Sequence, residues 1–252
     1  MSLMQMADMS LSFGGVLAVQ QVSFDVEQGE VFSIIGPNGA GKTTLFNLIS
    51  RLYDADEGVL TFEDIDITGT PAHHIAELGI ARTFQNTELF EHETVLYNLL
   101  IGKHVFRKTN LFTELCFLPS VRRQELVFRK EVEDTIDLLD LQHYRDQVIG
   151  NLPYGVRKMV EVARALCLKP KLLLLDEPSS GLNPEETEDL SFWIEDINEE
   201  LGTTIIMVEH DMNLVLRSSD RVMALADGKC LAIGKPNEIQ NNPDVIRAYL
   251  GD

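Results

Sequence analysis

The segment "GPNGAGKT", Gly36 to Thr43, decides the fold. It fits the pattern G-x-x-x-x-G-K-[ST], in which glycines let the backbone wrap closely around a phosphate. The apolar run Val31–Ile35 before it predicts a buried strand, and we expect a helix from Lys42 to about Arg51. Amides at a helix N-terminus carry partial positive charge and favour an anion. This strand–loop–helix order predicts a phosphate-binding loop in an α/β core.

The loop itself supplies most of the expected nucleotide contacts. Lys42 is expected to reach the β- and γ-phosphates, and the hydroxyl of Thr43 to ligate Mg²⁺. The full set of residues predicted to contact the nucleotide here is Gly36, Pro37, Asn38, Gly39, Ala40, Gly41, Lys42, Thr43 and Thr44.

A second signal is "LLLLDEP", Leu172 to Pro178. Carboxylates at the C-terminal end of a buried strand lie at the crevice where open α/β sheets bind ligands. We expect Asp176 to hold Mg²⁺ and Glu177 to orient or polarise the attacking water. An Asp-Glu pair alone is weak evidence, but together with the phosphate loop it predicts a nucleotide hydrolase.

Three further residues are weaker candidates. Gln85, in "RTFQNTELF", follows a short apolar run, and its amide is suited to contact Mg²⁺ or water. His210 ends the apolar run of "IIMVEHDM", and Phe13, in "LSFGG", is suited to stack on a base. Structural roles for each, as a strand-end polar residue, a structural histidine or a core phenylalanine, stay open from the residues alone.

The rest of the chain predicts one α/β domain, residues 1–252. Residues 3–35 and 58–67 are typical of short strands, which predicts an N-terminal antiparallel β subdomain. From about residue 95 to 168 the pattern is mostly helical, and we expect an inserted helical lobe there. Strands and helices then alternate, which favours a mostly parallel sheet with helices on both faces, a P-loop NTPase core.

Composition excludes several classes of function. The net charge of −19 would repel a phosphate backbone, so we expect no nucleic acid as partner. No apolar run approaches the ~20 residues that span a bilayer, so a membrane role would be peripheral. Basic residues are concentrated in one stretch, interleaved with apolar residues, which is either a solvated helical face or a docking surface. They are Lys103, Arg107, Lys108, Arg122, Arg123, Arg129 and Lys130, with Phe106, Leu111, Phe112, Phe117 and Leu118 among them.

Taken in order, these motifs resemble the nucleotide-binding domain of ABC transporters over essentially the whole chain. The resemblance implies ATP and Mg²⁺ as cofactors. It makes Phe13 the adenine-stacking aromatic, Gln85 a catalytic and Mg²⁺-contacting glutamine, and His210 the switch histidine. It also implies that two such domains pack head to tail, each closing a signature loop over the ATP held by the other. Residues Leu152 and Gly155 are expected to contact that opposing ATP.

The signature loop departs from the family pattern. Where L-S-G-G-Q is usual, this chain has Leu152-Pro153-Tyr154-Gly155-Val156. Proline has neither a hydroxyl nor a backbone N–H, and each hydrogen bond lost to a charged phosphate costs about 1.5–3 kcal/mol. Proline also suits the first turn of a helix, so the backbone geometry need not be lost. We therefore expect a heteromeric pair, in which a second homologous ATPase supplies the complete signature loop.

Longer stretches are similar to the ATP-binding subunit of branched-chain amino-acid importers. They are "RTFQNTELFEHETVLYNLLIGKH", "DEPSSGLNPEET" and "EHDMNLVL…GKPNEIQNNPDVIRAYLGD". That resemblance implies import of branched-chain amino acids or related small solutes. It implies transmembrane permease subunits and an extracytoplasmic solute-binding protein as partners. The chain would lie at the cytoplasmic face of the inner (plasma) membrane.

Other ATPases remain alternatives. An ABC exporter or lipopolysaccharide-extraction subunit would look similar over most of this length. A chromosome-maintenance ATPase would insert a long coiled coil between phosphate loop and signature, and this chain has no sustained heptads there. A ribosome-acting ABC factor would need two cassettes. A P-loop kinase or GTPase would not be expected to combine Gln85, Asp176-Glu177 and His210.

Overall fold

The structure is a computed structural model that describes residues 1–83, 89–106 and 119–250. The chain divides into two compact units, one made of Met1–Gln85 and Lys171–Asp252, the other of Asn86–Pro170. The helical lobe expected at 95–168 falls within the range of the second unit, and its description as part of one domain stays a prediction.

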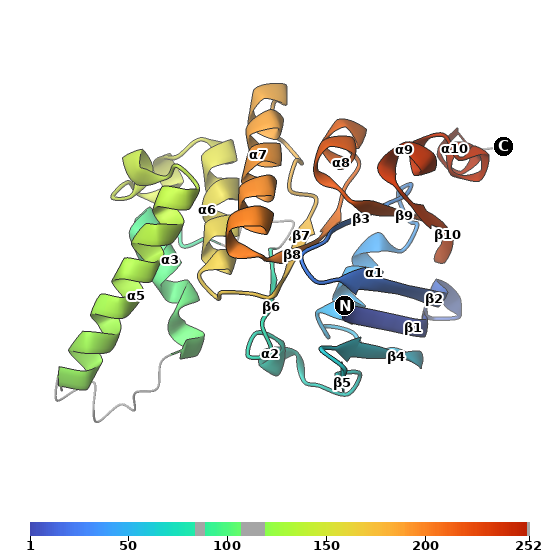
Figure 1. The fold of residues 1–252 in the computed structure, drawn as a ribbon, viewed down its shortest axis with the longest axis horizontal. Coiled ribbons are helices and arrows are strands. Elements are labelled where there is room, and N and C mark those ends of the chain that lie inside the picture. Colours follow the sequence, from blue (N-terminus) through green and yellow to red (C-terminus); the bar gives the residue numbers. More distant parts are fainter. Residues whose placement is uncertain (84–88, 107–118, 251–252) are drawn as a thin grey trace. The chain divides into compact units, whose positions relative to one another are not determined.

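Among the described residues of the first unit, the strands form two sheets (Figure 1). The four-stranded sheet has the order β2-β1-β4-β5 and is antiparallel throughout. Its strands are β1 (Ser2–Phe13), β2 (Val16–Glu27), β4 (Glu57–Phe62) and β5 (Ile65–Asp66). This confirms the predicted N-terminal antiparallel β subdomain.

The six-stranded sheet has the order β10-β9-β3-β8-β7-β6. Neighbouring strands from β9 to β6 run parallel, and only the edge strand β10 is antiparallel. The strands are β3 (Val31–Ile35), β6 (Ile80–Arg82), β7 (Leu172–Asp176), β8 (Thr204–Val208), β9 (Arg221–Ala226) and β10 (Lys229–Gly234). The expected α/β fold with a mostly parallel sheet is confirmed.

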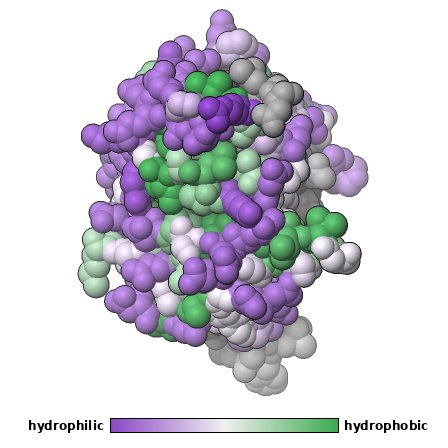
Figure 2. All heavy atoms as spheres, turned by 90° about the vertical axis from the view of Figure 1, so that its right-hand side faces the viewer, coloured by the Kyte–Doolittle hydropathy of each residue, from purple (hydrophilic) through white to green (hydrophobic). Residues whose placement is uncertain are grey.

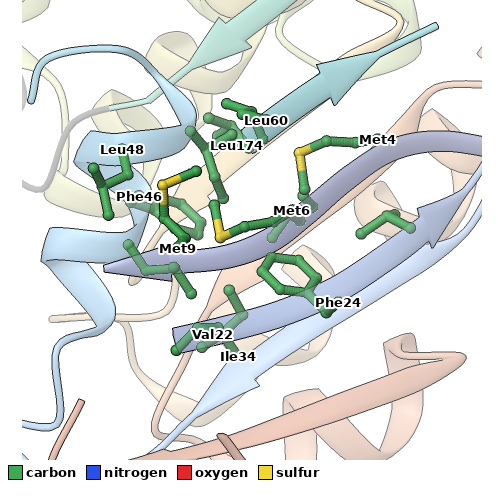
Figure 3. Packing of buried hydrophobic residues seen from close by; sticks show 14 of the residues in the cluster. Met4, Met6, Met9, Val22, Phe24, Ile34, Phe46, Leu48, Leu60 and Leu174 are labelled. Atoms are coloured by element: carbon green, nitrogen blue, oxygen red, sulfur yellow. The ribbon is translucent and has the colours of Figure 1, made fainter. Parts of the chain in front are cut away.

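One hydrophobic core fills the space between the two sheets and helix α1 (Lys42–Ile49). Side chains alternate between the two faces of a strand, so Met4 and Met6 of β1 point to the same face and enter this core. Met9 enters the same core because the pairing of β1 with β2 is irregular between Met6 and Met9 (Figure 3). In Figure 3 Met9 lies beside Phe46 of α1. The core therefore fixes the helix that follows the phosphate loop.

The opposite face of the six-stranded sheet carries a smaller core. Along β9, Met223 and Leu225 enter the first core, whereas Val222 and Ala224 enter the second. Helices cover this second face (Figure 1). They are α7 (Pro184–Leu201), α8 (Met212–Ser218), α9 (Pro236–Gln240) and α10 (Pro243–Leu250), and a further short helix, α2 (Ala72–Ile75), follows β5.

Two sheet edges of this unit expose apolar side chains. Figure 2 shows hydrophobic surface in the middle of the face on which β10 and α10 lie, bordered by hydrophilic residues. Exposed large hydrophobic residues of the elements on this side are Val16 and Leu17 on β2, Leu231 and Ile233 on β10, and Ile246 and Tyr249 on α10.

The second unit is built from helices. They are α3 (Val95–Gly102), α5 (Pro119–Leu138) and α6 (Tyr154–Leu166), with 3₁₀ turns at His104–Phe106, Gln142–Tyr144 and Ile149–Asn151. The helical pattern expected in this range is confirmed: Val132, Ile136 and Leu139 follow the i, i+4, i+7 spacing of one helix face, and all three are buried. No helix among the described residues combines the length and the apolarity that crossing a bilayer requires.

Lys103 is not part of an exposed basic face. Lys103 is 1% exposed, and its Nζ lies 2.9 Å from Oε2 of Glu131. Its inclusion in an exposed basic face was therefore wrong, because a buried ammonium needs a partner and finds one on α5. Arg122 and Arg123 are exposed on the same helix. Arg107, Lys108, Leu111, Phe112, Phe117 and Leu118 lie outside the described residues.

Candidate functional site

Sheet register brings the predicted site residues of the first unit to one edge. In the parallel ladder Ile34 of β3 pairs with Val208 of β8, and Val208 pairs with Asp176 of β7. The residues that follow these three positions therefore leave the sheet side by side. They are Gly36 at the start of the phosphate loop, Glu177, and the pair Glu209-His210.

The phosphate loop is shaped by close backbone approaches. A Cβ on Gly36 would lie 2.1 Å from the carbonyl oxygen of Leu225, and one on Gly41 would lie 2.4 Å from that of Ala18. Gly41 also has φ +101°, which side chains disfavour. Only glycine fits at both ends of the loop, and Pro37, Asn38, Gly39 and Ala40 span the turn between them. Ala40 closes it by accepting from the N–H of Gly228 at 3.0 Å.

Lys42 folds back over this loop. Its Nζ donates to the carbonyl oxygens of Gly36 at 2.7 Å and Pro37 at 3.0 Å, and the side chain is buried. Burial lowers the pKa of Lys42, and the nearby carboxylates of Glu177 and Asp176 oppose that change. The ammonium therefore lies close enough to both acids to interact with them electrostatically. The hydroxyl-bearing Thr43 is exposed at the start of α1 and Thr44 is half-buried.

Asp176, at the end of β7, is buried and ion-paired. Nη2 of Arg82 donates to its Oδ2 at 2.7 Å. Nη1 of the same guanidinium donates to Asn47 Oδ1 at 2.7 Å and Ser50 Oγ at 2.8 Å on α1. Arg82 therefore connects β6, β7 and the helix of the phosphate loop.

Glu177 and His210 form a close pair. His210 Nε2 lies 2.6 Å from Glu177 Oε1, and the carboxylate is 16% exposed against 41% for the imidazole. Glu177 has φ +48°, and its N–H donates to the carbonyl oxygen of Val208 at 3.0 Å. A left-handed backbone at a side chain of this size costs free energy and aims the carboxylate where an extended backbone would not.

Buried Glu209 joins the two segments that carry this pair. Its Oε1 accepts from the N–H of Ser179 at 2.8 Å. Its Oε2 accepts from Ser179 Oγ at 2.9 Å and from the N–H groups of His210 at 2.8 Å and Asp211 at 3.2 Å. Sequence reasoning missed both Glu209 and Arg82. Glu209 carried the signal used for Asp176, an acid that ends a buried strand, whereas nothing local marked Arg82.

The remaining candidates of the first unit are Phe13 and Gln85. Phe13 ends β1, is 47% exposed and contacts Tyr53 edge-on at 5.3 Å between ring centroids. It is therefore not a core phenylalanine, and its exposed ring face suits stacking. Gln85 lies outside the described residues.

The signature loop belongs to the second unit. Leu152 and Gly155 are buried, whereas Tyr154 is exposed beneath the guanidinium of Arg157, 6.0 Å from the ring centroid. Pro153 is the N-cap of α6, with φ −54° and ψ 153°, and its carbonyl accepts from Arg157 N–H at 3.1 Å. Pro153 therefore lies one residue before the first turn of α6, whereas the sequence predicted it within that turn. As proline it provides no side-chain cap.

Asn183 caps α7. Its Oδ1 accepts from Glu186 N–H at 3.0 Å, and Glu186 Oε2 accepts from Asn183 N–H at 2.9 Å. This capping box, with Pro184 at the first helical position, fixes where the helix starts.

The residues fit a magnesium nucleotide. Gly36 and Gly41, at the two ends of the loop, leave room for close backbone approaches that a Cβ would block, and Lys42 folds back against the loop. Among the described residues no cluster of three His, Cys, Asp or Glu side chains is arranged to hold a metal. Mg²⁺ is commonly bound by one or two protein oxygens together with phosphates and water. Asp176 and Thr43, which the sequence predicts as Mg²⁺ ligands, both lie at this edge of the sheet.

Comparison with known proteins agrees with this geometry. A model of the ABC transporter family matches residues 19–180, and a model described as branched-chain amino acid ATP-binding cassette transporter matches residues 229–252. The high-affinity branched-chain amino acid transport ATP-binding protein LivG of Salmonella typhimurium is 42% identical over 242 residues, which is 96% of this chain and 95% of LivG. BraF of Pseudomonas aeruginosa, named for the same transport role, is 40% identical over 250 residues, 99% of this chain and 98% of BraF.

A solved structure has the same fold. The ADP conformation of MJ1267, an ATP-binding cassette of an ABC transporter, matches with a TM-score of 0.87 and 32% identity, covering 100% of both chains. Because the family model spans residues 19–180 and the two relatives are at least 40% identical across nearly the whole chain, this chain belongs to the ABC transporter family as an ATP-binding cassette.

Proposed function

We propose that this chain hydrolyses ATP to drive the import of branched-chain amino acids or related small polar solutes. The observation that carries the proposal is the identity of 42% to LivG across 96% of the chain. The separate match of residues 229–252 to the branched-chain cassette model supports the same branch. Glu177, with its left-handed backbone and its 2.6 Å contact to His210, supports hydrolysis rather than binding alone.

Each residue at the sheet edge has a part in this proposal. The loop amides and Lys42 hold the phosphates, while Thr43, Asp176 and Gln85 hold Mg²⁺. ATP supplies the phosphoryl group that is transferred to water. Glu177 orients and polarises that water, which requires a carboxylate within hydrogen-bond reach of the reacting atoms.

The outer residues complete the site. His210 holds Glu177 through the 2.6 Å contact. In the proposed mechanism the imidazole also contacts the γ-phosphate of ATP. The exposed ring of Phe13 stacks on adenine.

The signature loop serves a second nucleotide. Leu152 and Gly155 contact the ATP of an opposing subunit in a head-to-tail dimer. Because Pro153 provides no hydroxyl or N–H, this loop closes the opposing site with fewer hydrogen bonds. The second homologous ATPase supplies a complete loop to the ATP held by Lys42, Asp176 and Glu177.

The working complex contains transmembrane permeases and an extracytoplasmic solute-binding protein. In this complex the chain is a peripheral subunit at the cytoplasmic face of the inner (plasma) membrane. A net charge of −19 disfavours nucleic acid as a partner.

The test is purification of the complex in mild detergent, followed by mass spectrometry and reconstitution into proteoliposomes. We expect a second ATPase, permeases, and ATP-dependent uptake of labelled leucine that Glu177→Gln abolishes. ATP-dependent uptake of unrelated solutes only would contradict the substrate class. A complex with this chain as its sole ATPase would contradict the heteromeric pair.

A further inference from the structure

Glu209 is an almost fully buried carboxylate, 1% exposed, at the end of β8. Four donors surround it, two from Ser179 and one each from His210 and Asp211, at 2.8 to 3.2 Å. Burial disfavours a charged carboxylate unless hydrogen bonds compensate, and here both oxygens accept. A buried acid with this many local donors holds its neighbouring backbone in one arrangement.

These contacts form a closed ring of interactions, which runs from Glu177 along the chain to Ser179, across to Glu209, on to His210 and back to Glu177. Ser179 follows Glu177 by two residues, and Glu209 directly precedes His210. Glu209 bonds to Ser179 at one side of the ring, and His210 Nε2 lies 2.6 Å from Glu177 Oε1 at the other. Neither segment can shift away from the other without breaking contacts to Glu209.

The ring is fastened to the sheet at two further points. Glu177 N–H donates to Val208 O at 3.0 Å, and Glu209 N–H donates to Ile34 O at 3.2 Å. Ser180 N–H in turn donates to the carbonyl oxygen of Glu177 at 3.1 Å, which holds the left-handed backbone there. The position of the Glu177 carboxylate therefore depends on the chain on both sides of it.

We propose that Glu209 is a positioning residue that sets the geometry of Glu177 and His210 for ATP hydrolysis. The proposal rests on the function proposed above. Glu209 does not touch the reacting atoms; it acts through the N–H of His210 and both donors of Ser179.

A carboxylate is needed because all four partners donate. The amide of a glutamine keeps one accepting oxygen and turns its NH₂ toward a donor. If its oxygen replaces Oε2, the NH₂ meets the N–H of Ser179. In the other orientation the NH₂ meets the N–H groups of His210 and Asp211, and only the Ser179 hydroxyl can turn to accept from it. Glu209→Gln therefore removes at least one hydrogen bond of the ring while nearly preserving side-chain volume.

The first measurement is steady-state ATP hydrolysis by the assembled transporter. We expect Glu209→Gln to lower kcat by about tenfold or more, because small misplacements of catalytic groups have effects of this size. KM for ATP should change by less than about twofold, since the phosphate loop is unaltered. Glu188→Gln, which removes an exposed carboxylate on α7, is the matched control and should match the wild type.

The second measurement does not depend on hydrolysis. The chain has six histidines, so ¹⁵N-histidine NMR of the isolated protein resolves each imidazole, and His210→Gln assigns the signal of interest. We expect Glu209→Gln to shift the His210 signal in the direction that Glu177→Gln shifts it, with His143 unmoved. A wild type without ATPase activity would contradict the proposed function yet leave this result intact.

Two results would overturn the positioning role. One is an unchanged kcat in Glu209→Gln. The other is a fall in kcat and in Tm with the His210 signal unmoved, as expected for a purely structural residue. If Glu209→Gln does not fold, Ser179→Ala removes one donor only. That variant should lower kcat less and still shift the His210 signal, and a wild-type signal and kcat in it would count against the proposal.

Discussion

Nη2 of Arg82 donates to Oδ2 of Asp176 at 2.7 Å, and the two side chains are 8% and 3% exposed. The acid expected to hold Mg²⁺ is therefore already neutralised by a buried cation. The same guanidinium binds Asn47 and Ser50 on α1. Arg82 thus sets how the predicted metal ligand lies relative to the helix behind the phosphate loop.

Loss of Arg82 should destabilise the protein strongly. Arg82→Gln leaves Asp176 buried without its cation, and breaking a buried pair costs about 3–5 kcal/mol of unfolding free energy. Arg217→Gln is the matched control, because Arg217 also lies 2.7 Å from a carboxylate, Glu188, but both side chains are more than half exposed. That pair should contribute at most about 1 kcal/mol. Urea denaturation measures both, and equal effects would contradict the burial argument.

Two glycines of the phosphate loop should differ in their tolerance of alanine. Gly41→Ala places a Cβ 2.4 Å from the carbonyl oxygen of Ala18, whereas Gly39→Ala meets nothing within 4 Å. Both residues have positive φ, so both variants share the backbone strain of about 1–3 kcal/mol. Titration with a fluorescent ATP analogue should show about tenfold or greater loss of affinity for Gly41→Ala relative to Gly39→Ala. Similar affinities would mean that the approach to β2 does not shape the loop.

Local patterns in the sequence predicted the fold well. The phosphate loop, Asp176 and His210 each lie at or just after the end of an apolar run that forms a strand. Parallel strands bring such ends together at one edge of the sheet. The strand pattern of residues 3–35 predicted β1 and β2, and the helical pattern of residues 95–168 agrees with the burial of Val132 on α5. These features depend on residues close together in the chain.

What the sequence did not predict depends on distant partners. Arg82 and Asp176 are 94 positions apart, and Ser179 and Glu209 are 30 apart. Lys103 was grouped with exposed basic residues because its burial depends on Glu131, in another helix. A charged residue in a local pattern is typical of a surface, and only tertiary contacts determine which charges are buried.

Glu177→Gln should separate nucleotide binding from hydrolysis. The amide keeps the size of the side chain and the positive-φ backbone but cannot act as a base, so turnover should fall on the order of 10²–10⁴-fold. Equilibrium binding of ATP should be retained, because Lys42 and the loop are unchanged. Glu185→Gln, an exposed acid in the first turn of α7, is the control. Brisk hydrolysis by Glu177→Gln would refute the assigned role.

Cys167 should make stability fall at alkaline pH. Burial raises the pKa of this thiol from 9.0 to about 11. Between these values the unfolded chain releases the proton and the native chain keeps it, so the stabilisation present below pH 9 is lost as pH rises toward 11. One such group adds a slope of at most about 1.4 kcal/mol per pH unit. Denaturation of Cys167→Ala across this range should show a shallower slope, and an unchanged slope would contradict the linkage.

Pro153→Ser should add a cap to α6. Pro153 occupies the N-cap with an extended backbone and no side-chain bond. A serine there accepts from the N–H of Gly155 or Val156, which stabilises a helix by about 0.5–2 kcal/mol. Pro153→Ala restores the backbone N–H without the hydroxyl and is the matched control. Thermal denaturation should rank serine above alanine, and equal Tm values would mean that the helix gains no cap.

The same variant should also change catalysis in the assembled complex. A serine hydroxyl accepts a capping bond through its oxygen and still donates its proton, so the cap does not compete with a phosphate contact. If the loop serves the opposing ATP, Pro153→Ser should raise ATP turnover by about tenfold or more at that site, the effect of one hydrogen bond to a charged group. The measurement is hydrolysis with Glu177→Gln also present in this chain, so that only the partner's site turns over. Turnover equal to that of Pro153→Ala would show that the hydroxyl does not reach the opposing nucleotide.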